Sequence, residues 1–281
     1  GLPLMTKKTV QKKNNKIYLK KTKNIELSIQ FSLDGFSFCI LETNTKKNIY
    51  FKEYQFEKTL NSPEDLLKKI IAIFKEDTNL QLAYDGVSVI HQNSLSTIVP
   101  NKYFNKNELI THLNFNVKIL KTDFITFDDL DAMDAKNVYI PYVNINNYLF
   151  QNFGEFEYQH HSTLLLKKLL KLEESNQKKM YVNVSKSSFD VVVLENKKLV
   201  FSNSFSYTTK EDFIYYILFT AEQIQLDTAV FNLYFMGEIY IDSEIYKIAY
   251  TYIKNIFFLK SKNSIFKDLE ITNHSNYILL G

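Results

Sequence analysis

The fold is decided by the stretch Leu27-Ser-Ile-Gln-Phe-Ser-Leu-Asp-Gly-Phe-Ser-Phe-Cys-Ile-Leu-Glu42, which recurs without a gap as Met180-Tyr-Val-Asn-Val-Ser-Lys-Ser-Ser-Phe-Asp-Val-Val-Val-Leu-Glu195. The apolar positions of the two stretches agree, and four aligned pairs are identical: Ser32/Ser185, Phe36/Phe189, Leu41/Leu194 and Glu42/Glu195. Each stretch has a short polar turn at its centre, at residues 33–35 and 186–188. Each copy therefore predicts two strands joined by a tight turn.

The same order of elements continues after each copy. A helix start is marked by Ser62 with Asp65, and again by Thr209 with Asp212. The hydroxyl can cap free N–H groups of the first turn, and the acid three residues later favours the helix N-terminus. Strands flank these helices, at residues 47–52 and 87–91 in the first copy and at 198–202 and 231–236 in the second.

Three strands, a helix and a returning strand begin a ribonuclease-H-like sheet. The predicted fold class is therefore α/β with mixed sheets, built from two tandem ribonuclease-H-like βββαβα units in the actin-like ATPase architecture. The expected domains are residues 25–160, with a small insertion around 91–127, and residues 161–281, which begin with a linker helix. Further helices are expected at 107–114, 144–153, 164–174 and 243–254, strands at 96–100, 138–141 and 155–159, and a closing strand or turn at 277–280.

The composition is that of a globular protein, with 45% hydrophobic and 15% aromatic residues among 281. No stretch approaches the roughly 20 apolar residues that cross a bilayer, and no secretory signal is recognised. Cys39 is the only cysteine, which excludes an intrachain disulfide and makes a core position the simplest interpretation. A cytoplasmic location is expected.

The positive charge is concentrated at the start of the chain. Residues 1–24 hold eight lysines and no acid, and are expected to be a disordered basic tail, with residues 1–4 a cloning remnant. The rest of the chain carries more acidic than basic residues, and the chain contains no arginine. Because arginine is the side chain that most often binds phosphates and guanine edges through paired hydrogen bonds, a nucleic-acid-binding surface is not expected.

Three segments resemble actin-like proteins of the type IV pilus assembly and bacterial cell-division kind. Residues 29–38 look like their first phosphate hairpin, residues 91–100 like the strand pair that opens their small subdomain, and residues 138–141 like the strand that follows. More closely, residues 25–281 resemble the uncharacterised domain-of-unknown-function family 3822. The resemblance implies the same fold and no assigned activity.

A nucleotide site in this architecture needs glycine where the backbone meets phosphate, and acidic residues that hold Mg²⁺. The resemblance implies that these positions are degenerate here: Gln30, Ser32, Asp34 and Gly35 in the first hairpin, Asn183, Ser185 and Ser187 in the second, and Gly237 and Glu238 on the adenosine side. Two amides supply no negative charge for Mg²⁺. The chain has six glycines, where average usage predicts about 20. No cofactor is therefore expected, and ATP with Mg²⁺ stays the alternative.

Other candidate sites are weaker, and neither a catalytic residue nor a metal site is assigned. The acidic run of Asp128, Asp129, Asp131 and Asp134 lacks the glycine and late glutamate of a calcium loop, and is interpreted as a solvated loop. Adjacent His160 and His161 would point to opposite faces of a strand, so they are interpreted as surface residues. Ser185, Ser187 and Ser188 are interpreted as turn residues.

The sequence therefore predicts an uncharacterised, non-catalytic actin-like protein, a degenerate ATPase that acts as a protein-interaction scaffold for an unidentified protein partner. Two alternatives remain. One is a divergent ATP-binding or ATP-hydrolysing protein that uses Asp34 or Asp190. The other is an RNA-associated factor that uses the lysine tail, residues 5–24.

Overall fold

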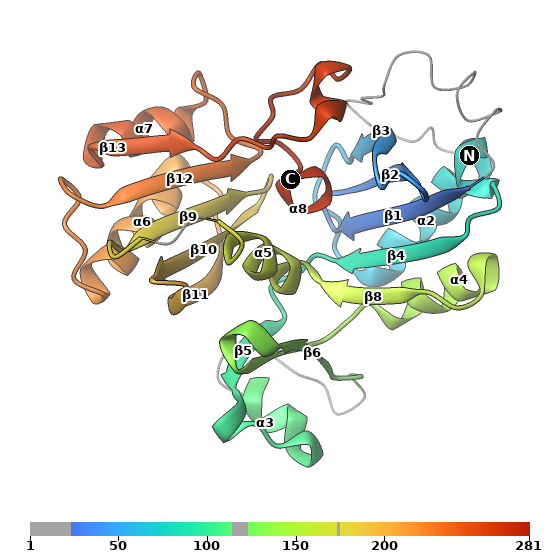
Figure 1. The fold of residues 1–281 in the computed structure, drawn as a ribbon, viewed down its shortest axis with the longest axis horizontal. Helices are drawn as coiled ribbons and strands as arrows, with labels where there is room; N and C mark the ends of the chain where they lie inside the picture. The colour runs from blue at the N-terminus through green and yellow to red at the C-terminus, as the bar shows by residue number, and fades with distance from the viewer. Residues whose placement is uncertain (1–23, 114–122, 173–174) are drawn as a thin grey trace.

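The computed structural model describes residues 24–113, 123–172 and 175–281. The predicted basic tail lies outside these residues, except for residue 24. The described chain forms two large lobes that stand side by side, with a smaller sheet below them (Figure 1). We call the part built on the first large sheet the first lobe and the part built on the second the second lobe.

Each lobe contains a five-stranded mixed sheet, and the two sheets have the same strand order relative to the sequence. In each, an antiparallel meander of three strands is extended by two parallel strands. The first sheet has the order β3-β2-β1-β4-β8, formed by Asn48–Gln55, Gly35–Glu42, Ile25–Ser32, Gly86–His91 and Glu157–His160. The second has the order β11-β10-β9-β12-β13, formed by Lys198–Ser206, Ser188–Glu195, Lys179–Val184, Asn232–Gly237 and Asn255–Phe258.

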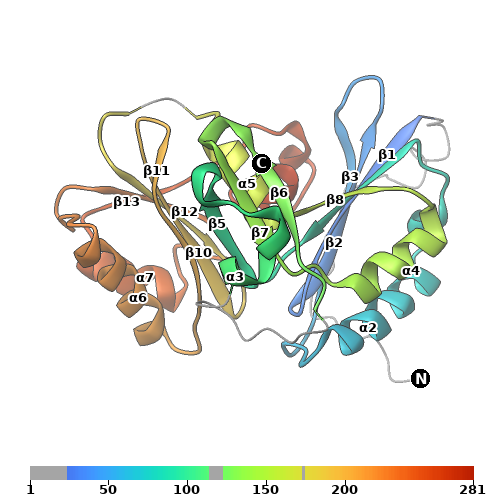
Figure 2. The same cartoon turned by 90° about the horizontal axis from the view of Figure 1, so that it is seen from below.

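Helices cover the outer face of each sheet, as Figure 2 shows. The first lobe carries α2 (Pro63–Glu76) and α4 (Val143–Phe153), and the second carries α6 (Lys210–Gln223) and α7 (Glu244–Tyr252). The predicted caps are confirmed: Ser62 accepts from the backbone N–H of Asp65, and Thr209 forms a complete capping box.

Two further helices, α5 (His161–Leu169) and α8 (Tyr277–Leu280), lie between the sheets (Figure 1). Their leucines pack in one apolar core with side chains from the inner faces of both sheets, among them Phe51 and Val192. Cys39 lies buried in this core, as predicted. The inner faces of the sheets are therefore joined by an apolar core.

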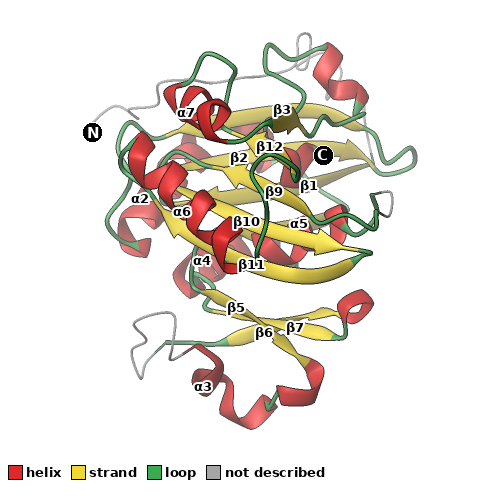
Figure 3. Ribbon diagram, turned by 90° about the vertical axis from the view of Figure 1, so that its left-hand side faces the viewer, coloured by secondary structure: helices red, strands yellow, loops and turns green. Residues whose placement is uncertain are grey.

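The smaller sheet has the order β5-β7-β6, formed by Ser96–Pro100, Ala135–Tyr139 and Thr126–Leu130. With α3 (Leu109–Leu113) it encloses its own apolar core, which contains Val99 and Val138. In Figure 3 this sheet lies below the two large ones, with β5 nearest to β11.

Two predicted elements were wrong in kind or extent. Residues 277–280 form the helix α8 rather than a closing strand or turn, because β13, which was not predicted, takes the last place in the second sheet. The helix predicted at 164–174 is α5, which begins earlier, at His161, and ends at Leu169.

Candidate functional site

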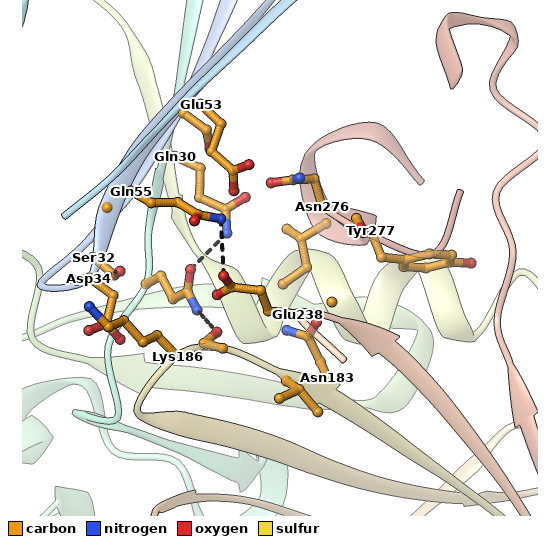
Figure 4. Close-up of a pocket in the computed structure, with 18 of the residues that line it drawn as sticks. Gln30, Ser32, Asp34, Glu53, Gln55, Asn183, Lys186, Glu238, Asn276 and Tyr277 are labelled. Carbon is orange, nitrogen blue, oxygen red and sulfur yellow. Dashed lines mark hydrogen bonds between the residues drawn. The ribbon is translucent and has the colours of Figure 1, made fainter. Parts of the chain in front are cut away.

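The predicted site residues come together where the β1–β2 and β9–β10 turns of the two lobes meet. We call this cavity the central pocket, and Figure 4 shows side chains from both lobes pointing into it. Eight of the nine predicted residues line it: Gln30, Ser32, Asp34, Gly35, Asn183, Ser185, Gly237 and Glu238. The ninth, Ser187, hydrogen-bonds to Asp34 at 2.6 Å.

Strand periodicity explains why these side chains face the pocket. Along β1, fully buried residues alternate with half-buried ones, and Ile29 and Phe31 face the core under α2. Gln30 and Ser32 therefore lie on the opposite face, toward the second lobe. On β9, Asn183 lies on the same face as Tyr181, which packs in the core between the sheets.

Amide side chains link the two lobes directly across the central pocket (Figure 4). Gln30 donates through Nε2 to Oε1 of Gln92 at 2.9 Å, and Gln92 donates through Nε2 to Oγ of Ser185 at 2.6 Å. Gln55 donates through Nε2 to Oε1 of Glu238 at 3.0 Å. Sequence reasoning did not single out Gln55 or Gln92, because a lone glutamine in a strand or loop carries no motif.

The two hairpin turns are also bonded to each other. Asp34 accepts from Oγ of Ser187 at 2.6 Å and from Oγ1 of Thr59 at 2.5 Å, so its carboxylate bridges the lobes. Lys186 donates through Nζ to the backbone carbonyl of Phe56 at 2.8 Å. The carboxylate that could anchor a divergent phosphate site is therefore engaged by protein hydroxyls.

The central pocket is small. Its cavity volume is about 100 Å³, below the roughly 300–1,000 Å³ of typical ligand pockets. Part of its wall comes from residues 275–278, at and before the start of α8. The two glycines also face protein backbone, because an added Cβ at Gly35 would lie 2.7 Å from the Tyr54 carbonyl oxygen and one at Gly237 would collide with Val184.

A buried histidine–aspartate pair joins α5 to the second sheet, next to the central pocket. His161 Nε2 lies 2.9 Å from Oδ1 of Asp190, which also accepts from Ser204 at 2.6 Å and from Asn183 at 3.1 Å. Burial disfavours the charged carboxylate, but His161, Ser204 and Asn183 outweigh burial and hold the pKa of Asp190 below its ordinary value. Asp190 is thus fully occupied by protein partners.

The prediction that His160 and His161 are surface residues was wrong, since their exposed fractions are 0% and 2%. His160 ends β8 and His161 begins α5, so the two rings do not alternate as on one strand. His160 Nε2 lies 2.9 Å from Oδ1 of Asn93. Burial, with the neighbouring His161, holds the pKa of His160 well below its ordinary value.

The solvated-loop prediction was also wrong for Asp128, which lies on β6 and points toward the start of α5. It accepts from the backbone N–H of His160 at 2.8 Å, from Thr163 at 2.7 Å and from Tyr139 at 3.0 Å. Burial raises the pKa of Asp128 although these donors oppose the shift. Asp129 lies on the same strand and pairs with Lys136, whereas Asp131 and Asp134 are exposed, as predicted.

Within residues 24–113, 123–172 and 175–281, no group of three or more histidine, cysteine or acidic residues could hold a metal ion. In the same part of the chain, every helix is too short or too polar to cross a bilayer.

The strand order and the central pocket define a protein of the actin-like ATPase fold. A Bacteroides thetaiotaomicron protein described as having this fold and unknown function superposes with a TM-score of 0.76, at 23% identity over 85% of this chain and 92% of that one. A chain of a PilM–PilN type IV pilus biogenesis complex gives a TM-score of 0.53, at 10% identity over 84% and 88% of the two chains. These likenesses show the fold, and the predicted fold class is confirmed.

The chain itself belongs to the family described as protein of unknown function, DUF3822, which it matches over residues 14–256. The predicted family is therefore confirmed. No curated protein matches the chain.

Proposed function

We propose that this chain is a non-catalytic actin-like protein, in which side chains close the nucleotide cleft and the rigid pair of lobes serves as a protein-interaction scaffold. The observation that carries the proposal is the hydrogen-bonded chain Gln30–Gln92–Ser185, which crosses the cleft from one lobe to the other. At the positions where a nucleotide-binding relative is expected to hold Mg²⁺ and phosphate, the side chains of this protein form hydrogen bonds with each other.

The charges in the central pocket support the proposal. Mg²⁺ binds through carboxylates and phosphates in near-octahedral geometry, and neutral amides are poor substitutes. Gln30 and Asn183 stand at the two positions that the resemblance assigns to carboxylates. Asp34 and Glu238 do line the pocket, but each accepts hydrogen bonds from the chain itself.

We also infer that the two lobes arose by internal duplication, with boundaries near residues 25–160 and 161–281. Both sheets have the same strand order, and equivalent residues occupy equivalent register positions. Gln30 lies opposite Ser37 in the first sheet, and Asn183 lies opposite Asp190 in the second. A cytoplasmic location stays part of the proposal.

The scaffold role is supported by analogy with the PilM–PilN complex, in which a chain of this fold is part of an assembly. A fold that keeps two large packed sheets without an accessible nucleotide cleft still offers a rigid surface. The partner we propose is another protein, whose identity neither the fold nor the central pocket specifies.

The test is whether Mg-ATP stabilises the protein. A ligand at 100 times its Kd raises the free energy of unfolding by about 2.7 kcal/mol, which is several degrees in melting temperature for a chain of this size. We expect no shift with millimolar Mg-ATP, and no phosphate release above that of a buffer blank.

The divergent-ATPase alternative predicts the opposite outcome. A Mg²⁺-dependent shift of several degrees that is lost in Asp34→Asn would replace our proposal with that alternative. Asp242→Asn is a matched control, because Asp242 is exposed and does not line the central pocket.

A further inference from the structure

The helix α6 carries aromatic side chains on the outside of the second lobe. Figure 2 shows α6 on the outer face of the second sheet, as α2 is on the outer face of the first. Tyr215 is 59% exposed and Phe219 is 42% exposed, and their rings stack with 5.9 Å between the ring centres. Single apolar residues are common on protein surfaces, whereas grouped ones mark sites of interaction. We call the outer face of α6 that carries these two rings the aromatic face.

The equivalent helix of the first lobe shows that the fold does not require an aromatic outer face. α2 and α6 both have 14 residues and begin at equivalent caps, Ser62 and Thr209. Counted from the caps, Tyr215 corresponds to Lys68, which is exposed on α2. A surface helix keeps polar residues on its outer face, as α2 does, and a helix that is apolar on all sides is covered. In α6 the apolar run of residues 213–219 continues around the helix, so its outer face has the composition of a covered one.

The rings of the aromatic face are held in place by their neighbours. Tyr215 contacts Tyr216 edge to face at 5.4 Å, and Tyr216 stacks on Phe205 of β11 at 4.8 Å. Phe205 in turn lies 5.5 Å from the ring of Phe189, which is buried in the core of the second lobe. Side chains that are already ordered lose little conformational freedom when a partner covers them. The aromatic face therefore offers preorganised anchors of the kind that contribute most to binding at protein interfaces.

Acidic residues lie at both ends of the aromatic face. Glu211 is exposed one turn before the two rings, and Glu222 is exposed one turn after them. Two neighbouring lysines, Lys210 and Lys247, both pair with Glu244, at 3.7 and 3.2 Å. With a rise of 1.5 Å per residue, Glu211 and Glu222 stand about 16 Å apart along the helix axis. The face is therefore apolar at its centre and negative at each end.

This charge pattern does not fit a second copy of the chain. Two α6 helices packed face to face would bring one acidic end against another, whether the helices run parallel or antiparallel. Like charges that meet across an interface oppose association, and opposite charges favour it. The charge pattern therefore fits a different partner, one with basic residues at the same spacing.

We propose that the aromatic face of α6 binds an amphipathic helix of a partner protein, with apolar side chains at the centre of that helix and a lysine or arginine near each end. The apolar side chains of the partner helix cover Tyr215 and Phe219. Its two basic residues, about eleven positions apart, pair with Glu211 and Glu222. This inference rests on the proposed scaffold role and names the surface and the partner chemistry.

The experiment begins with a displayed library of 18-residue helical peptides with one randomised face, selected against the full chain. Selected peptides are synthesised, and their affinities are measured by fluorescence anisotropy. The double variant Tyr215→Lys/Phe219→Ala gives α6 the residues that α2 has at the equivalent positions, Lys68 and Ala72. It is expected to weaken binding by more than about tenfold. Phe150→Ala is the matched control and should bind as the wild type does, because Phe150 is 58% exposed on α4 of the other lobe.

Charge variants separate the proposed pairing from simple apolar contact. Glu211→Gln combined with Glu222→Gln should weaken the selected peptides by about two- to tenfold at low salt, since exposed ion pairs contribute modestly. The loss should shrink at high salt, which screens exposed charges. A selected peptide whose basic residues are replaced by glutamine should bind the wild type and this charge variant equally well.

The proposal is overturned if the selection yields no binding helix, if Tyr215→Lys/Phe219→Ala binds as tightly as the wild type, or if the charge variant leaves the affinity unchanged. It is also overturned if sedimentation shows a dimer that the double variant dissociates, since a second copy would then cover the aromatic face. A helix that binds regardless of these variants leaves the scaffold role intact. Mg-ATP binding at the central pocket instead removes the scaffold role and leaves the peptide result to stand alone.

Discussion

Replacement of Asp190 by alanine is the sharpest test of how the two lobes are held together. Asp190 is 6% exposed and binds His161, Ser204 and Asn183, so truncation leaves buried polar partners unpaired. Removing one member of a buried, hydrogen-bonded ion pair lowers the free energy of unfolding by about 3–5 kcal/mol. Because His161 belongs to α5 and Asp190 to β10, the loss acts on the packing of α5 against the second sheet.

Urea unfolding followed by circular dichroism measures this loss. We expect Asp190→Ala to lower the free energy of unfolding by about 3–5 kcal/mol, and Asp190→Asn by about 1–3 kcal/mol, because asparagine keeps the shape and part of the hydrogen bonding. Asp242→Ala, at an exposed position, should change it by less than about 0.5 kcal/mol. A loss below about 1 kcal/mol for Asp190→Ala would refute the reasoning.

Three other predictions follow from buried groups and from backbone geometry. Burial lowers the pKa of His91 from 6.5 to about 4, so the unfolded chain takes up a proton at a higher pH than the folded chain does. The free energy of unfolding should therefore fall by about 3 kcal/mol between pH 6.5 and 4 from this residue alone. In urea titrations, His91→Gln should remove this part of the pH dependence of stability. Gly237 has φ +86°, and a Cβ there would collide with Val184, so Gly237→Ala should lower the free energy of unfolding by more than about 2 kcal/mol. Gly154 has φ +72° but open space around it, so Gly154→Ala should lower it by only about 1 kcal/mol. Thermal melts measure both losses. Gln92→Ala removes both hydrogen bonds that link Gln30, Gln92 and Ser185, and should lower the free energy of unfolding by about 1–3 kcal/mol. An unchanged melting temperature would contradict a bridging role for Gln92.

The elements of the fold could be predicted because local signals and long-range pairing agree. The repeated stretches place two strands and a polar turn in each lobe, and the helix caps at Ser62 and Thr209 carry their own short-range signature. Strand alternation then places Gln30 on the inner face of its sheet. These features depend on residues that are neighbours in sequence or in one hairpin.

The contacts that close the central pocket could not be predicted in the same way. Gln55 and Glu238 are far apart in sequence, and their hydrogen bond depends on how the two lobes pack. His160 and His161 were misread because strand alternation was applied across a strand–helix junction, where the chain changes direction and both rings become buried. Asp128 was misread because its burial is set by α5, which packs against β6 from a distant part of the sequence.

Amides at the central pocket explain how two lobes with this architecture can be bonded directly to each other. A glutamine donates and accepts at once, so Gln92 can accept from Gln30 and donate to Ser185 without a bridging ion. Carboxylates at the same positions would only accept, and would repel each other unless a cation lay between them. In the proposed function, an amide at Gln30 in place of a carboxylate both removes an anchor for Mg²⁺ and supplies a donor to the bonds that cross the cleft, so one substitution accounts for both properties.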